Sequence, residues 1–202
     1  MTISRERMDP GLDLSFSCCC GLVAGTLVNP GPGVGDHVVC HCTDCQAFAE
    51  RLNAVNRVLD QHNGTALYQG RCASMEISKG RDQLACFHLT EKPTLRWYAR
   101  CCDTPMFNTY KNGHVPYITT VVANCEPDQQ ERLLGQPIGH LFIKEATGDV
   151  RHLRRLSMVT LMRRFFRRMV ADMVTGDRRR AALFDPGTLE PIASPALRAP
   201  RA

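Results

Sequence analysis

The chain has 202 residues, of which 44% are apolar and 22% are charged. These values are ordinary for a soluble globular protein, and they favour one domain with tails. The charged N-terminal segment "MTISRERMDP" is followed by no apolar stretch long enough for a signal peptide or a transmembrane helix, so we expect a cytoplasmic protein.

The net charge of +5 is unevenly distributed along the chain. Residues 151–180 hold ten arginines and two aspartates, which leaves 15 basic and 18 acidic residues elsewhere, about −3. The basic character therefore belongs to one segment and not to the whole surface. This charge distribution does not indicate a protein that binds nucleic acid over its whole surface.

Short runs rich in Val, Ile, Thr, Phe and Tyr dominate residues 12–127, and Gly, Pro and Asn separate them. These runs are typical of β-strands. They read "LDLSFSC", "GLVAGTLV", "HVVC", "TALYQ", "ASMEIS", "LACFHL", "TLRWYARC", "PMFNTY" and "VPYITTVV". We predict an N-terminal tail over residues 1–11 and a mainly β domain over residues 12–150.

A helical pattern interrupts the strands directly after the segment "CHCTDC". Phe48, Leu52, Val55 and Leu59 are spaced by three or four residues, which predicts one helix or two short ones. We expect Asp44 to cap this helix. A helix N-terminus beside thiols favours their ionised, metal-binding form, so the placement suits a metal site.

Residues 151–180 predict a basic amphipathic helix that ends near Gly176. We expect its apolar stripe to pack on the β domain while the arginines face solvent. Contact with a membrane surface or another anionic partner is the alternative, and sequence-specific nucleic acid is not expected. A Pro-rich tail follows over residues 181–202. The stripe consists of Leu153, Leu156, Val159, Met162, Phe166, Met169 and Met173.

Eight of the eleven cysteines fall into three short clusters, "SCCCG" at 17–21, "CHCTDC" at 40–45 and "RCC" at 100–102. A reducing cytoplasm keeps thiols free, so such clusters are more typical of metal ligands than of disulfides. Zinc suits them because it accepts tetrahedral sulfur ligands without redox change. An iron–sulfur cluster and inert buried thiols are the alternatives. The isolated Cys72, Cys86 and Cys125 are expected to be packing residues.

The central cluster predicts a zinc site at Cys40, Cys42 and Cys45. Three ligands in one loop, with no obvious fourth, are typical of a catalytic zinc with an open position for substrate. His41 is expected to support the ligands or to be exposed, and ligation by it is the alternative. Gln46 is expected to line the site.

Three aromatic residues near the cysteines are interpreted as structural. Phe48 lies on the apolar stripe of the predicted helix and is expected in the core. Trp97 and Tyr98 are adjacent in a predicted strand, so we expect one to face inward and the other outward. A core role is expected for the inward residue.

Three motifs carry a resemblance to a known family, namely "SCCCG" ending at Gly21, "CHCTDCQAF" from Cys40 and "RWYARCCDTPMF" from Arg96. In this order they resemble the glutathione-dependent formaldehyde-activating enzyme and centromere protein V family, over about residues 12–120. The closest likeness is to a poorly characterised bacterial branch. The resemblance implies an Mss4-like β-tent of short antiparallel strands with zinc as cofactor.

The resemblance also assigns the ligands to two zinc ions. It implies that Cys40, Cys42 and Cys45 hold a zinc at the active site and are the catalytic residues. It implies that Cys18 and Cys20 are ligands of a structural zinc.

The last part of the structural site departs from the family pattern. Cys102 matches the family's final cysteine, whereas Ala99 stands where the preceding cysteine should be. One zinc is therefore expected at the triple, and a second only if Cys101 or Cys19 turns inward. Adjacent residues of a strand point to opposite faces, so a bulge or turn would be needed for Cys101 to join Cys102.

Two functions from different classes follow. The resemblance implies a zinc-dependent carbon–sulfur lyase of the S-(hydroxymethyl)glutathione synthase type, which acts on glutathione or another small thiol and an aldehyde. The spacing of the cysteines supports only the metal. The alternative is a non-catalytic zinc-binding module whose basic helix contacts an anionic partner or a membrane surface. The sequence indicates neither the glutathione-recognition residues nor the oligomeric state.

Overall fold

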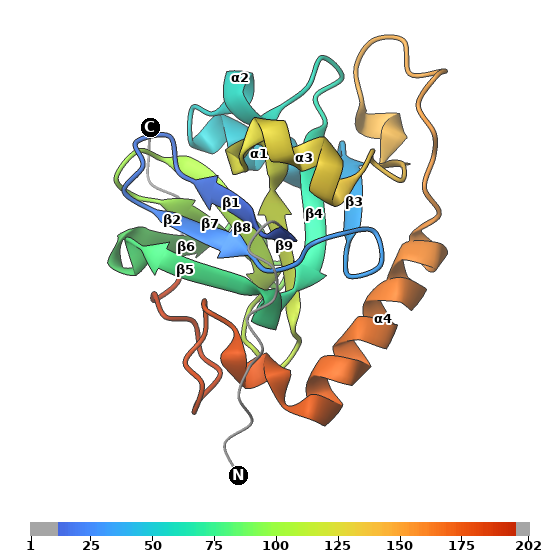
Figure 1. Ribbon diagram of the computed structural model, residues 1–202. Helices are drawn as coiled ribbons and strands as arrows, with labels where there is room; N and C mark the ends of the chain where they lie inside the picture. The colour runs from blue at the N-terminus through green and yellow to red at the C-terminus, as the bar shows by residue number, and fades with distance from the viewer. Residues whose placement is uncertain (1–11, 197–202) are drawn as a thin grey trace.

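The computed structural model describes residues 12–196, which form two β-sheets with helices packed around them (Figure 1). The smaller, antiparallel sheet has the strand order β1-β2-β5, and the larger has the order β10-β3-β4-β9-β8-β7-β6. Among neighbouring strands of the described residues, β10 and β3 are the one parallel pair. The strands are β1 Leu14–Ser17, β2 Ala24–Leu27, β3 Asp36–Cys40, β4 Thr65–Arg71, β5 Met75–Lys79, β6 Leu84–His88, β7 Thr94–Ala99, β8 Thr104–Tyr110, β9 Tyr117–Val121 and β10 His140–Leu141.

Nine of these strands, β1 to β9, lie on the nine runs predicted from the sequence. The mainly β architecture is therefore confirmed, as are the helix after the central cysteines and the C-terminal helix. The α-helices are α1 Thr43–Arg51, α2 Val55–Val58, α3 Pro127–Leu134 and α4 Met158–Thr175. Helix α3 was not predicted. Among the described residues, no helix combines the length and the apolar character needed to cross a bilayer.

The helical stretch after the central cysteines is divided in two. Asn53 adopts a left-handed conformation, with φ of 50°, and separates α1 from α2. The predicted stripe is correct for Phe48 and Leu52, which are buried, but wrong for Val55, which is exposed. The break restarts the helical period, so Val58 takes the buried position in α2.

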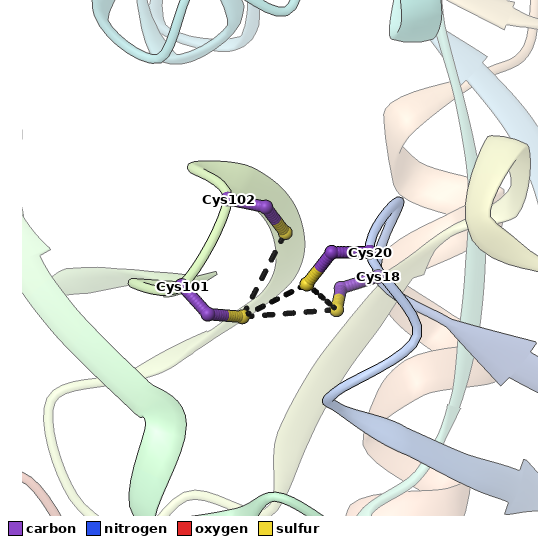
Figure 2. Close-up of side chains that lie close together, drawn as sticks. All are labelled: Cys18, Cys20, Cys101 and Cys102. Atoms are coloured by element: carbon purple, nitrogen blue, oxygen red, sulfur yellow. Dashed lines mark hydrogen bonds between the residues drawn. The ribbon is translucent and has the colours of Figure 1, made fainter.

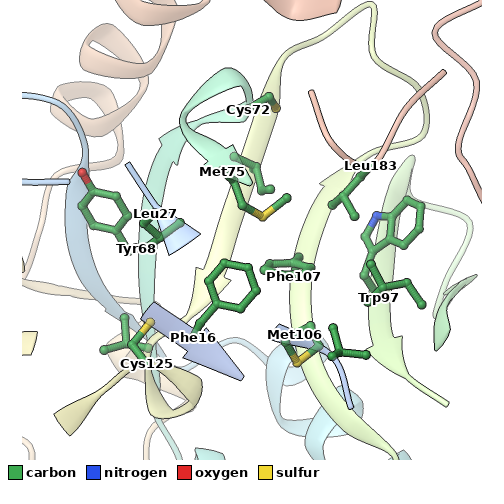
Figure 3. Close-up of a cluster of buried hydrophobic side chains, with 14 of the residues drawn as sticks. Phe16, Leu27, Tyr68, Cys72, Met75, Trp97, Met106, Phe107, Cys125 and Leu183 are labelled. Carbon is green, nitrogen blue, oxygen red and sulfur yellow. The ribbon is translucent and has the colours of Figure 1, made fainter. Parts of the chain in front are cut away.

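One hydrophobic core lies between the two sheets, and Figure 3 shows part of it. Phe16 of β1 meets Phe107 of β8 edge to face, with ring centroids 5.3 Å apart. The segment after α4 closes this core, because Leu183 and Phe184 are buried and Phe184 packs edge-on against Trp97. Apolar burial on this scale is the main source of stability for such a domain.

A second core covers the other face of the large sheet, under α1, α2 and the start of α4. Here Phe87 contacts both Phe48 and Tyr98, with ring centroids 5.8 and 5.7 Å apart. The expectation that one of Trp97 and Tyr98 faces outward is therefore wrong. They do point to opposite faces of β7, but both faces of the sheet are covered, so both side chains are buried.

Helix α4 is confirmed as a helix that ends at Gly176, where φ is 75° and a residue without Cβ is favoured. It begins at Met158, later than the predicted residue 151, and its predicted packing stripe is wrong. The side chains that it buries are Leu161, Phe165 and Asp172, whereas most of the predicted stripe faces solvent. The physical reason is that α4 carries apolar residues on two faces, and only one of them meets the sheets.

Candidate metal centres

The three central cysteines come together where β3 passes into α1. Cys40 ends β3, Cys42 precedes the first turn of α1, and Cys45 lies within that turn. Their Sγ atoms all lie within 4.8 Å of one another, and the sulfurs of Cys40 and Cys42 are 3.4 Å apart. Cys40 and Cys45 are buried, and Cys42 is half-buried. The structure thus brings the predicted triple to one point.

The start of α1 differs from the sequence-based expectation. Cys42, and not Asp44, occupies the capping position, and its carbonyl accepts the N–H groups of Cys45 and Gln46. Asp44 lies in the first turn and pairs with Lys92 at 2.6 Å. These two hydrogen bonds form the first turn of α1, and the turn holds Cys42 and Cys45 close together.

The three thiols differ in how readily they lose their protons. Hydrogen bonds from Cys40 and Cys42, together with the positive charge of Arg96, hold the pKa of the Cys45 thiol well below its ordinary value despite burial. The pKa of Cys40 is raised, because its thiol is hydrogen-bonded with Cys42 and Cys45 and is buried. One thiolate therefore forms readily, and a cation is needed to stabilise the ionised form of all three.

Arg96 on β7 is the buried cation of this site, and only 6% of it is exposed. Its Nη1 lies 3.7 Å from Cys45 Sγ and donates a 2.9 Å hydrogen bond to Asn108 Oδ1. Asn108 in turn donates to Thr119 Oγ1 at 2.8 Å. The side chains of three neighbouring strands thus fix the guanidinium beside the thiolate.

A cavity of about 200 Å³ opens beside the three thiols. Polar groups from the large sheet line one side, and apolar groups from β10, the segment after it and α4 line the other. Gln69 Oε1 is buried in this wall and has no hydrogen-bond partner within the described residues. The lining residues are Val38, Cys40, Cys42, Cys45, Leu67, Gln69, Thr94, Arg96, Asn108, Tyr117, Thr119, Leu141, Phe142, Met158, Leu161 and Met162.

His41 does not complete the triple. Its ring is fully buried, with Nδ1 3.1 Å from the carbonyl of His62 and Nε2 3.0 Å from Nδ1 of His140. Both ring nitrogens are therefore engaged away from the sulfurs, and the expectation of an exposed ring is wrong. Within residues 12–196, the group around Cys40 contains no fourth His, Cys, Asp or Glu ligand.

Four other thiols form a second cluster, shown in Figure 2. Cys18 and Cys20 come from the loop between β1 and β2, and Cys101 and Cys102 come from the turn between β7 and β8. The sulfur of Cys18 lies 3.5 Å from that of Cys20 and 3.9 Å from that of Cys101. Cys101 lies 3.4 Å from Cys20 and 3.8 Å from Cys102.

These separations match a tetrahedral zinc site, in which sulfurs at about 2.3 Å from the ion lie about 3.8 Å apart. Cys101 thus occupies the place in the cluster that the motif resemblance gave to position 99, where this chain has Ala99. The chain turns sharply there, with Asp103 in the left-handed region at a φ of 51°, so two adjacent residues can face one point. Cys19 instead points outward and is exposed.

Thr104 supports the four-cysteine cluster. Its Oγ1 accepts hydrogen bonds from the N–H of Cys19 and from Arg57, which leaves its own hydrogen to donate to Cys102 Sγ at 3.1 Å. Burial alone would raise the pKa of Cys102, but the bonds from Thr104 and the Cys20 backbone lower it to about 6. A thiolate at neutral pH is the form that binds a metal.

The remaining candidates have structural roles. Cys72, Cys86 and Cys125 are buried in the core between the sheets. Gln46 does not reach into the cavity, because its amide donates to the carbonyls of His41 and Glu145 at 2.7 and 3.0 Å. These bonds tie α1 to the segment that follows β10.

Three important residues escaped the sequence-based reasoning, namely Gln69, Arg96 and Thr104. Arg96 left a signal, because it is a charged residue inside the otherwise apolar run "TLRWYA". A charge at such a position is rarely buried without a partner. The partner comes from α1, 51 positions earlier in the chain, and could not be identified without the fold.

Comparisons with known proteins give a family and a weak structural likeness. A family model described as a family of unknown function (DUF6151) matches residues 12–193. No curated protein matches the sequence. Among solved structures, the chain is similar to a Rhodobacter sphaeroides protein, a structural genomics target, with 16% identity and a TM-score of 0.40. That match covers 59% of this chain and 97% of the other.

Proposed function

Because the chain belongs to a family of unknown function, DUF6151, we propose a function from its own sites. We propose that Cys40, Cys42 and Cys45 hold a zinc ion that accepts a small thiol, and that the protein makes or breaks a carbon–sulfur bond between this thiol and an aldehyde. The observation that carries the proposal is the cavity of about 200 Å³ beside a cluster of three thiols.

The two cysteine groups suit different roles. Four thiols around one point close a tetrahedral site, which is the arrangement of a structural zinc. Three thiols beside a cavity leave one position open, which is the arrangement of a catalytic zinc. The soft sulfur ligands favour zinc over magnesium or calcium, so we propose zinc at both sites.

The motif resemblance to the formaldehyde-activating family supports the reaction. Zinc in the triple would lower the pKa of a bound thiol and present it as a thiolate. A thiol and an aldehyde then combine without a further reagent. The sulfur–carbon bond forms, the carbonyl π electrons move to oxygen, and the proton of the thiol ends on that oxygen. The reverse reaction releases the thiol and the aldehyde.

The cavity residues fit the hydroxyl-bearing product of this reaction. A buried acceptor without a partner costs roughly 1–3 kcal/mol, so Gln69 Oε1 favours a ligand that brings a donor. The hydroxyl of the thiol–aldehyde adduct is such a donor. Together with the hydrogen bonds from Cys40 and Cys42, Arg96 lowers the pKa of the Cys45 thiol, and it also holds Asn108 at the cavity wall. Leu161, which is buried on α4, excludes water from the opposite side.

Metal content tests the first half of the proposal. Wild type, Cys42→Ser and Cys18→Ser are purified under reducing conditions, and bound zinc is measured by native mass spectrometry. We expect two ions in wild type and one in each variant. The outcome that sinks the proposal is a Cys42→Ser variant that keeps both ions, or wild type without zinc at the triple.

Cobalt substitution tests the open position. The thiolate-to-cobalt absorption of the triple, measured in Cys18→Ser, should change when a small thiol is added and stay unchanged with the matching alcohol. Product formation from glutathione and formaldehyde is then followed by NMR. Gln69→Leu should lower the rate by about tenfold or more, because a hydrogen bond to the adduct is lost. Equal rates in both proteins would exclude the assigned role of Gln69.

A further inference from the structure

The outward face of α4 is apolar, although this helix lies at the edge of the molecule (Figure 1). Val159 and Val174, near its two ends, are 79% and 81% exposed, and Phe166 near the middle is 49% exposed. Isolated exposed apolar residues are common, but a row of them along one helix marks an interaction surface. The row consists of Met158, Val159, Met162, Phe166, Val170, Met173 and Val174.

The inward face of α4 is already fully used, so the helix cannot rotate to bury this row. Leu161 and Phe165 pack on the large sheet, where Phe165 meets Tyr117 edge to face at 5.6 Å. Arg168 bonds to the buried Asp36 at 2.5 Å, and Arg71 Nε donates to the buried Asp172 at 2.6 Å. A rotation would break both charged contacts and leave buried charges unpaired.

The charge around the apolar row is of one sign. Arg163 and Arg167 are exposed on its edge, and neither forms an ion pair within residues 12–196. The two carboxylates of this segment, Asp172 and Asp177, are both held by Arg71. No free carboxylate of residues 158–180 therefore offsets these arginines.

We infer that α4 docks on an anionic membrane surface, with its axis parallel to the surface and its apolar row among the lipid headgroups. A helix of 18 residues offers about 27 Å of such a row. Apolar residues beside arginines are the combination that binds anionic lipids at an interface. A second copy of this chain fits less well, because it would bring the same arginines and no free carboxylate from its own α4.

This inference is independent of the metal chemistry, but it bears on access to it. Met158 and Met162 belong both to the apolar row and to the wall of the cavity beside the triple. Docking therefore places the wall of the cavity that contains Met158 and Met162 next to the membrane surface. A ligand that partitions into the lipid interface would have a short path to the three thiols.

Vesicle sedimentation tests the inference with the full chain. We expect wild type to sediment with phosphatidylcholine vesicles that contain phosphatidylserine, and far less with phosphatidylcholine alone. Phe166→Glu should weaken binding at least about tenfold, because it puts a charge into the apolar row. Arg163→Gln and Arg167→Gln should each weaken binding to the anionic vesicles about fivefold.

The matched control is Val55→Glu, which introduces the same charge at an exposed valine of α2, away from α4. It should bind like wild type, and all variants should keep their zinc content and melting temperature. The inference is overturned if wild type ignores anionic vesicles, or if Val55→Glu weakens binding as much as Phe166→Glu. It is also overturned if light scattering shows a dimer that Phe166→Glu dissociates while no protein sediments with lipid.

Discussion

Arg96 donates to Cys45 across 3.7 Å inside the protein, and both residues are more than nine-tenths buried. Three thiolates around a divalent cation carry a net charge of −1, and this charge is costly to bury without a counter-ion. Arg96 supplies the missing positive charge from the middle of the large sheet. Arg96 would therefore offset the charge of a metal-bound triple without itself being a ligand.

Replacing Arg96 should weaken the metal site at the triple. In Arg96→Met the thiolate of Cys45 loses a hydrogen bond and a buried positive charge, so its pKa rises. We expect zinc affinity at this site to fall by about 10–100-fold, as is common for residues that support metal ligands. Competition with a chromophoric chelator, in the Cys18→Ser background, measures it.

The control for this experiment is Lys92→Met. Lys92 also pairs with Asp44 near the triple, but its side chain is 65% exposed and its charge is screened by water. We expect an affinity within about twofold of wild type. If Arg96→Met and Lys92→Met lose zinc affinity equally, the loss comes from the overall change in charge and not from the buried guanidinium of Arg96.

Thr104 should control the reactivity of the four-cysteine cluster. In metal-free protein, Thr104→Val removes the hydrogen bond that lowers the pKa of Cys102, so this pKa should rise from about 6 towards the ordinary thiol value. The rate of alkylation against pH reports the change. Thr104→Ser keeps the hydroxyl and should restore the low pKa. A profile unchanged in Thr104→Val would show that another group stabilises the thiolate.

The two phenylalanines Phe107 and Phe166 should respond very differently to truncation. Phe107 is fully buried between the sheets, so Phe107→Ala should lower the free energy of unfolding by about 3–5 kcal/mol. Phe166 is half-exposed on α4, so Phe166→Ala should change it by less than about 0.5 kcal/mol. Urea denaturation compares the two. A large loss in Phe166→Ala would mean that α4 packs differently from the described structure.

Stability should fall at alkaline pH because of buried thiols. Burial raises the pKa of Cys125 to about 12, from an ordinary thiol value of 9.0. Above about pH 9 the unfolded chain loses this proton while the folded chain keeps it, so deprotonation favours unfolding. The stability that the protonated thiol gives to the folded state is fully present below about pH 9. It is lost as the pH rises towards 12, by up to about 1.4 kcal/mol per pH unit for each such thiol.

Urea denaturation between about pH 8 and pH 10.5, in a reducing buffer, measures this slope. Cys125→Ala should show a shallower decline than wild type. Val174→Ala is the control, because Val174 is 81% exposed and has no titrating group, and its slope should equal that of wild type. The same slope in all three proteins would mean that Cys125 does not titrate differently on folding.

The sequence by itself determined what depends on neighbouring residues. The spacing of Cys40, Cys42 and Cys45 keeps three thiols within six consecutive residues, which span the junction of β3 and α1. Short runs rich in Val, Ile, Thr, Phe and Tyr identified strands β1 to β9, and Gly176 marked the end of α4. In each case the deciding factors are the conformational preferences of the residues and the local backbone geometry.

Only the tertiary structure decided what depends on residues far apart in the chain. Cys101 joins Cys18 because the turn between β7 and β8 lies beside the loop after β1, 83 positions away. Tyr98 is buried because helices cover the second face of the large sheet. The apolar row of α4 is exposed because Asp36 and Arg71 draw the opposite face inward. Packing and charge pairing between distant residues determine all three features, and the local sequence pattern does not predict them.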